Sequence, residues 1–86
     1  MATATLTGVR TGNIRGLEVY VGVGNIATVG DSIEAPSTNV VAVIGNYADQ
    51  TGVSELRFEF TSGDATVTVW GDTGLDFSFV IWYVGS

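Results

Sequence analysis

The 86-residue sequence predicts an all-β fold, either a small antiparallel β-sandwich or a jelly-roll-like barrel of about seven strands. β-Branched and aromatic residues are frequent, and apolar and polar residues alternate in several segments, as they do in half-buried strands. Twelve glycines, together with Asn and Asp, separate these segments in the manner of turns between short strands. No segment keeps the 3.6-residue apolar period of a helix.

The four N-terminal strands are predicted at residues 3–9, 14–23, 26–34 and 38–46. The second contains valines that alternate with glutamate, tyrosine and glycine, which is the period of a strand with two different faces. The third is the weakest prediction. Pro36 follows it and predicts a loop or a sheet edge there, because proline cannot donate to a strand ladder.

The three C-terminal strands are predicted at residues 53–62, 65–71 and 75–84, and their register follows from the turns. Gly63-Asp64 is a favoured two-residue hairpin turn between the first two of them. A shift of one residue would separate the apolar positions that this turn brings together. The pairs it predicts are Phe60 with Val67 and Phe58 with Val69.

Asp72-Thr73-Gly74 is predicted as a three-residue hairpin loop with the glycine in the left-handed conformation. The loop would place Val69 opposite Phe77 and Val67 opposite Phe79. The last three strands would then form one meander with a continuous apolar inner face. That face would consist of Phe58, Phe60, Val67, Val69, Phe77, Phe79 and Ile81.

The same register aligns three candidate binding residues, Arg57, Trp70 and Asp76, across the outer face of the meander. An arginine beside an indole ring predicts a cation–π contact worth about 0.5–1 kcal/mol at an exposed site. The row is consistent with an ordinary solvated ladder of cross-strand pairs, or with a platform that binds a sugar or a protein.

Val80, Trp82 and Val84 make the end of the outer face apolar, so the last strand is apolar on both sides. A bare strand of this kind would promote aggregation. We expect it to be covered by another strand of the same chain or by a neighbouring subunit. These three residues are the main candidate interface.

The chain is predicted to form one domain over residues 1–86, with residues 1–13 as an extended N-terminal arm or an edge strand. No signal peptide is expected, because Met1 precedes neither a basic nor an apolar segment. The most apolar stretch, from Phe77 to Val84, is shorter than the about 20 residues of a membrane-spanning helix.

The net charge is −6, from nine acidic residues and three arginines, which disfavours binding to nucleic acid or to anionic lipid. The sequence has no cysteine and no histidine, so neither disulfides nor the usual zinc sites can stabilise so short a chain. Association with further copies of the chain is the remaining reinforcement. A homo-oligomer is therefore predicted.

An enzymatic role is not predicted. Cys–His and Ser–His nucleophiles are excluded, and lysine is absent as well. Calcium binding by Asp72 and Asp76 is not predicted, because Asp72 is interpreted as a turn residue. The segment from Gly22 to Ala27 matches a relaxed dinucleotide fingerprint but lacks the following helix, so Gly22 and Gly24 are interpreted as a bulge or a close backbone approach. No cofactor and no metal is expected.

The chain starts with Met-Ala-Thr-Ala-Thr-Leu-Thr-Gly, its strands are rich in Thr, Val and Gly, and its end contains Ala-Thr-Val-Thr-Val-Trp-Gly-Asp-Thr-Gly-Leu-Asp-Phe-Ser-Phe. In these features the whole chain resembles the small virion proteins that decorate or cement the capsids of tailed bacteriophages. The resemblance implies a β-rich, often trimeric protein on the capsid surface, with the major capsid protein or another virion protein as its partner. It transfers no binding residue to this chain.

Two functional hypotheses follow. The first is a structural virion protein, made in the host cytoplasm, that docks as an oligomer on a capsid through the apolar patch at Val80, Trp82 and Val84. The alternative is a carbohydrate- or protein-binding β-sandwich that uses Trp70 with Arg57 and Asp76.

Overall fold

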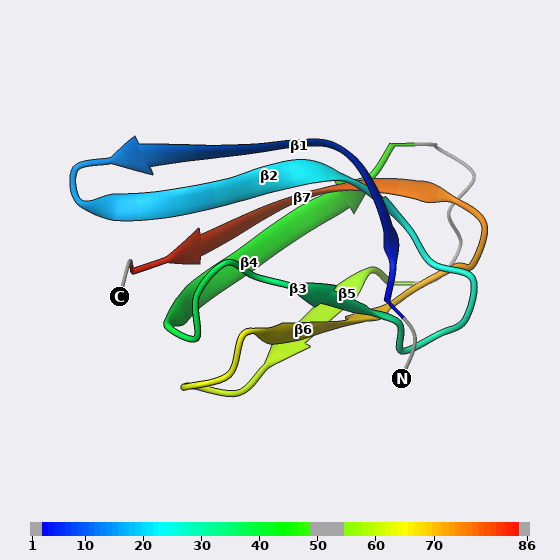
Figure 1. Cartoon of the computed structure of the whole chain (residues 1–86). Coiled ribbons are helices and arrows are strands. Elements are labelled where there is room, and N and C mark those ends of the chain that lie inside the picture. The colour runs from blue at the N-terminus through cyan, green and yellow to red at the C-terminus, as the bar shows by residue number, and fades with distance from the viewer. Residues whose placement is uncertain (1–2, 49–54, 85–86) are drawn as a thin grey trace.

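The structure, a computed structural model, describes residues 3–48 and 55–84. In these residues the chain forms seven strands and no helix. The strands are β1 (Thr5–Ile14), β2 (Leu17–Asn25), β3 (Ser32–Glu34), β4 (Val40–Tyr47), β5 (Arg57–Phe60), β6 (Thr66–Trp70) and β7 (Asp76–Tyr83). They build one antiparallel sheet in the order β1-β2-β7-β4 and a second in the order β3-β6-β5 (Figure 1). The predicted all-β sandwich is confirmed.

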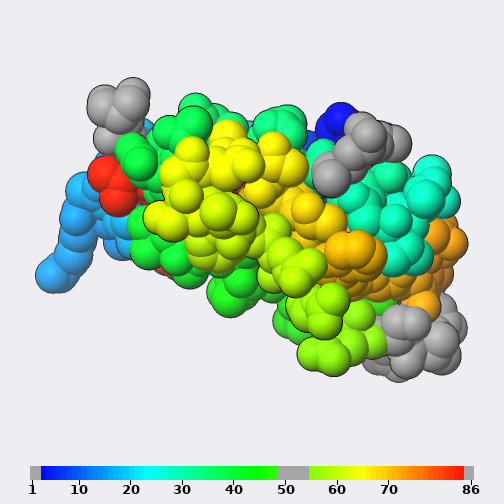
Figure 2. Space-filling model, turned by 90° about the horizontal axis from the view of Figure 1, so that it is seen from below, coloured from blue at the N-terminus to red at the C-terminus, as the bar shows by residue number. Residues whose placement is uncertain are grey.

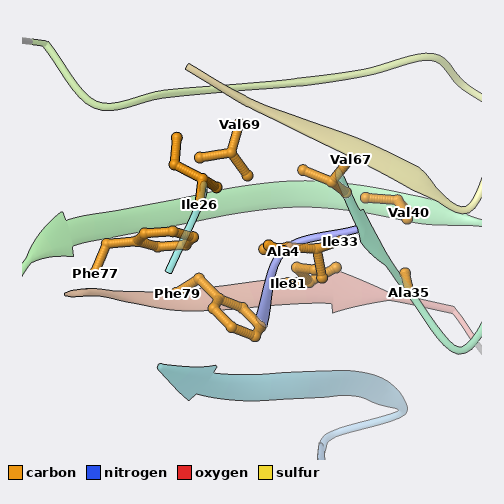
Figure 3. Close-up of a cluster of buried hydrophobic side chains, with 10 residues drawn as sticks. All are labelled: Ala4, Ile26, Ile33, Ala35, Val40, Val67, Val69, Phe77, Phe79 and Ile81. Carbon is orange, nitrogen blue, oxygen red and sulfur yellow. The ribbon is translucent and has the colours of Figure 1, made fainter. Parts of the chain in front are cut away.

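The two sheets enclose one apolar core, because the inward side chains of β6 and β7 face each other from opposite sheets (Figure 3). The Phe77 ring lies at the centre of the aromatic part. Its centroid is 5.8 Å from that of Phe58, in edge-to-face geometry, and 6.2 Å from that of Phe79. The buried cluster consists of Ala4, Ile26, Ile33, Ala35, Val40, Val67, Val69, Phe77, Phe79 and Ile81.

Inward-facing glycines make room for these rings in the larger sheet. A Cβ on Gly24 would lie 2.5 Å from the Phe77 ring, and one on Gly45 would lie 2.8 Å from the Phe58 ring. The close backbone approach predicted at Gly24 is therefore confirmed. Glycine at these two positions allows a two-layer core to hold phenylalanines opposite each other.

The first hairpin turns at a different place from the one predicted. The turn residues are Arg15 and Gly16, with φ angles of 53° and 86°, whereas the sequence predicted a strand over 14–23 and a break at 10–13. Two successive positive φ angles are typical of a type I′ turn, which matches the twist of the flanking strands. The Asn13 side chain supports the turn by accepting a hydrogen bond of 3.1 Å from the Gly16 N–H.

The weakly predicted strand at 26–34 is correct only for its last three residues, which form β3. The preceding residues turn around Asp31. Its buried carboxylate accepts hydrogen bonds from the backbone N–H groups of Ala27 and Thr28, at 3.0 and 3.1 Å. A side-chain acceptor of this kind favours a turn over a strand ladder.

The C-terminal hairpin is predicted correctly in one half and wrongly in the other. β5 pairs with β6 in the predicted register, Phe58 with Val69 and Phe60 with Val67. β6 and β7 do not pair, because the segment after Trp70 crosses from the small sheet to the large one. Gly74 is left-handed as predicted, with a φ of 80°, but it belongs to an arch between sheets rather than to a hairpin.

β1 is an edge strand of the larger sheet. The residues before it run along the small sheet, where Thr3 forms a parallel bridge to Ser32 and the Ala4 N–H donates to the Ser32 carbonyl at 2.8 Å. Of the two alternatives for the N-terminal segment, the described residues therefore adopt the edge strand. Residues 1 and 2 lie outside the described part of the chain.

Candidate functional site

β7, which carries most of the candidate interface, lies in the middle of the four-stranded sheet. It is hydrogen-bonded on one side to β2 and on the other to β4. Both of its edges are thus covered by strands of the same chain, which is one of the two coverings that the sequence left open. Its inward residues are buried, whereas Val80 and Trp82 point to the opposite side and are only half-buried.

The pairing register extends the apolar surface around Val80 and Trp82 over three strands. Val19 of β2 lies opposite Trp82, and Val21 lies opposite Val80. Ala42 of β4 lies beside Trp82 from the other side. We call the resulting surface the apolar face. It consists of Val19, Val21, Val23, Ala42, Ile44, Val80 and Trp82.

The apolar face is open over the described part of the chain: the small sheet packs on the other side of the large sheet (Figure 1). Ile44 is 59% exposed. Between β4 and β7 the surface forms a shallow hollow of about 350 Å³, lined on the outer side by residues such as Asn46 and Ser78. None of the seven side chains of the face is charged, so a partner needs a matching apolar surface.

Val84 follows β7 and is 45% exposed. Its N–H donates to the Asn39 carbonyl and its own carbonyl accepts from the Ser37 hydroxyl, each at 3.0 Å. These two bonds hold the backbone after β7 against the loop before β4. Val84 is therefore fixed in place next to the apolar face.

Sequence reasoning found the β7 part of the apolar face and missed the parts on β2 and β4. The signal was present on β2, where Val19, Val21 and Val23 recur at every second position. The alternation of apolar and polar residues alone does not show which side of the strand faces the core. Because Tyr20 packs against the core and Gly24 faces Phe77, the valines are left outside.

The outer face of the small sheet is polar, and its side chains interact with one another. Arg57 lies directly opposite Trp70, with its guanidinium carbon 5.8 Å from the ring centroid, so the predicted cation–π contact is confirmed. The Trp70 indole N–H donates to the Glu59 carboxylate. In addition, the Thr66 hydroxyl donates to Glu34 at 2.9 Å.

Asp76 does not join Arg57 and Trp70, so the predicted three-residue row is wrong. Asp76 begins β7 in the other sheet, where its carboxylate accepts a hydrogen bond of 3.0 Å from the Asn25 side-chain amide. The error follows from the arch between β6 and β7: a residue assigned to a third strand of a meander lies in the opposite layer instead.

Tyr83 is the inward residue at the end of β7 and is only 6% exposed. Burial raises the pKa of its phenol, and the nearby Glu18 and Tyr20 raise it further. Glu18 is the cross-strand partner of Tyr83, so the pairing of β2 with β7 positions the negative charge beside the phenol. The effect favours the neutral form of Tyr83 in the folded protein.

Within residues 3–48 and 55–84, no group of three Asp or Glu side chains is close enough together to hold a metal ion. The same residues form no helix that is long and apolar enough to cross a bilayer. The chain matches no protein-family model, and no curated protein or solved structure is significantly similar to it.

Proposed function

We propose that this chain is a structural assembly protein that docks on a larger protein shell through the apolar face. One observation carries the proposal: seven uncharged, apolar side chains from β2, β4 and β7 form one continuous outer surface. Soluble proteins seldom leave so large a contiguous apolar surface without a partner. The polar outer face of the small sheet would point away from the shell.

The shape of the sheet supports a broad contact rather than a ligand pocket. The apolar face is only shallowly hollowed, and its side chains stand on three hydrogen-bonded neighbouring strands. A rigid sheet loses little conformational entropy on docking, which favours binding to an equally rigid surface. Trp82, on the central strand of the face, is the expected energetic anchor, because buried tryptophans dominate many interfaces.

The resemblance to phage decoration proteins supplies the identity of the shell. We therefore propose the surface of a virus capsid, with the major capsid protein as the partner. The strongly acidic charge of the chain is compatible with a position outside the particle, away from the packaged nucleic acid.

The test is co-sedimentation of the chain with virus particles assembled in cells that make it. Wild-type chain is expected to sediment with the particles, and Ile44→Lys is expected to remain in the soluble fraction. Ile44 is exposed on the outer side of β4, so the added lysine leaves the core unchanged but places a charge that docking would have to desolvate. Trp82→Ala is expected to lower the occupancy as well.

Val29→Lys is the matched control, because Val29 is an apolar β-branched residue of similar exposure that lies outside the apolar face, in the loop before β3. It is expected to sediment like wild type. Equal sedimentation of Ile44→Lys and wild type would exclude docking through the apolar face. Absence of the wild-type chain from all particles would exclude the capsid as the partner.

The sugar-binding alternative is not favoured by the geometry at Trp70. Arg57 lies over the ring, and the indole N–H is already bonded to Glu59. A sugar would have to displace at least one of these two side chains to stack on the indole. A saccharide-dependent change in tryptophan fluorescence that Trp70→Ala removes would revive this alternative.

A further inference from the structure

The β1–β2 hairpin extends beyond the rest of the sandwich, as both views of the molecule show (Figures 1 and 2). We call residues 10–17 the hairpin arm. Side chains 10 to 16 are all exposed, and Ile14 is 53% exposed. At Ile14–Leu17 the hairpin runs past the last residue of β2 that pairs with β7, so its tip is two-stranded and gains little stability of its own. The tip of the arm therefore contributes little to the fold of one chain.

The arm concentrates positive charge. It carries Arg10 and Arg15, two of only three cationic residues in a chain with nine acidic ones. Arg15 occupies the first turn position with a φ of 53°, a conformation that Asn, Asp and Gly adopt more readily than arginine. The turn thus holds a guanidinium at its tip although a neutral residue would suit the backbone better.

A surface that complements the arm lies on the small sheet. A hollow of about 390 Å³, which we call the acidic hollow, is lined by Glu59, Phe60, Thr61, Asp64, Thr66 and Thr68. It combines two carboxylates with Phe60, which is 36% exposed. In Figure 2 the segment that lines the hollow, coloured yellow, lies on the face toward the viewer, and the arm, coloured blue, projects at the left edge.

We infer that the partner of the hairpin arm is the acidic hollow of a second copy of this chain. The Arg15 guanidinium would bind the carboxylates of Glu59 and Asp64, since arginine pairs with carboxylates in well-defined geometry. Ile14 would lie on the exposed edge of Phe60. The contact offsets part of the repulsion between two chains of net charge −6 by bringing the cations of one to the acids of the other.

The two contact surfaces are different, so each copy offers one arm and one hollow. Such head-to-tail contacts produce a ring when the rotation between copies closes, and a filament when it does not. The contact supplies the oligomer that a domain without disulfide or zinc needs. It extends the assembly role proposed above but uses none of the residues of the apolar face.

The first test compares Arg15→Asn with wild type by light scattering over a range of protein concentrations. Wild type is expected to form an oligomer, and Arg15→Asn to weaken its association at least about tenfold. Asparagine suits the turn, so the monomer should be at least as resistant to urea as wild-type monomer. A monomeric wild type, or unchanged association of Arg15→Asn, would overturn the inference.

The hollow is tested with Glu59→Gln and Asp64→Asn, which remove charge and keep the existing bonds. Glu59 accepts from the Trp70 indole and Asp64 accepts from the Thr66 N–H, and an amide oxygen can replace either acceptor. Both variants are expected to dissociate more readily than wild type, and the difference should shrink in high salt. Wild-type association of the double variant would contradict the assigned surface.

A charge exchange distinguishes this contact from the docking function. Arg15→Glu and Asp64→Lys should each be monomeric alone and should associate with each other when mixed, in oligomers where the two variants alternate, because each then complements the other. Ile44→Lys should keep the wild-type oligomer mass even if it no longer docks. A mixture that stays monomeric would exclude the arm-to-hollow contact. Loss of the oligomer in Ile44→Lys would instead place the copies face to face through the apolar face.

Discussion

Tyr83 shows how strand pairing sets the chemistry of a single residue. The phenol is inward-facing at the end of β7, and the register puts the Glu18 carboxylate opposite it. Burial, followed by the charge of Glu18 and by Tyr20, raises the pKa of the phenol above its ordinary value of 10.0. In the unfolded chain none of these causes acts, so the phenol ionises at a lower pH there than in the folded protein.

This difference predicts a loss of stability in alkaline solution. The folded state favours the protonated phenol, so its contribution is present below pH 10 and is lost as the pH rises through the higher pKa of the folded state. We expect the urea midpoint of wild type to fall more steeply above pH 10 than that of Tyr83→Phe. Parallel pH curves for the two proteins would show that Tyr83 does not titrate differently in the folded state.

At the scale of elements, the core depends on glycines that face inward from strands. Gly24→Ala would place a Cβ 2.5 Å from the ring of Phe77, which is itself buried in the core. We expect a loss of about 1–3 kcal/mol in the free energy of unfolding, the usual cost of overpacking a filled core. Denaturant unfolding measures it.

Gly12→Ala is the matched control for this prediction. Gly12 also lies in a strand of the large sheet, but it is exposed, and the nearest atom to its added Cβ is a Val19 methyl carbon at 3.3 Å. A side-chain methyl group on an exposed face can shift slightly, so we expect a change within about 0.5 kcal/mol. Equal losses for both variants would mean that Phe77 does not fill the space at Gly24.

The fold class and the inward residues of β6 and β7, with Phe58 of β5, could be predicted from the sequence, but the layer of β7 could not. Phe60, predicted on the same inner face, is 36% exposed. In a hairpin, Val69 and Phe77 would be neighbours in one sheet. In an arch, they face each other across the core, and in both cases they are apolar and inward. Alternation defines a face of each strand, whereas choosing between hairpin and arch requires knowing that β2 and β4 are better partners for β7.

The same ambiguity explains which site residues were predicted. Val80 and Trp82 were placed correctly on the outer side because they alternate with buried residues of their own strand. Asp76 was wrongly placed beside Trp70 because β7 was assigned as a neighbour of β6, whereas β7 pairs with β2 and β4. The first turn was missed for a local reason. Arg15 is not a typical residue for positive φ, so a strand rather than a turn was predicted at this position.

At the scale of the whole molecule, different parts of the surface differ in polarity and charge. The large sheet has an apolar outer face, the small sheet has a polar and mostly acidic one, and the hairpin arm carries two of the three arginines. In a free monomer, no other described part of the chain covers the outer side of the apolar face or the tip of the arm. In the proposed assembly all three parts would be used: one face to dock, and the arm and hollow to link copies.

If copies are linked in this way, thermal stability must depend on protein concentration. Association that involves only folded chains shifts the unfolding equilibrium by mass action. We expect the Tm of wild type to rise by at least about 5 °C over a hundredfold increase in concentration, given the small unfolding entropy of a domain of this size. Arg15→Asn should show a nearly constant Tm over the same range, measured by circular dichroism in cuvettes of different path length. A wild-type Tm that is independent of concentration would mean that the arm and the hollow do not meet before the protein unfolds.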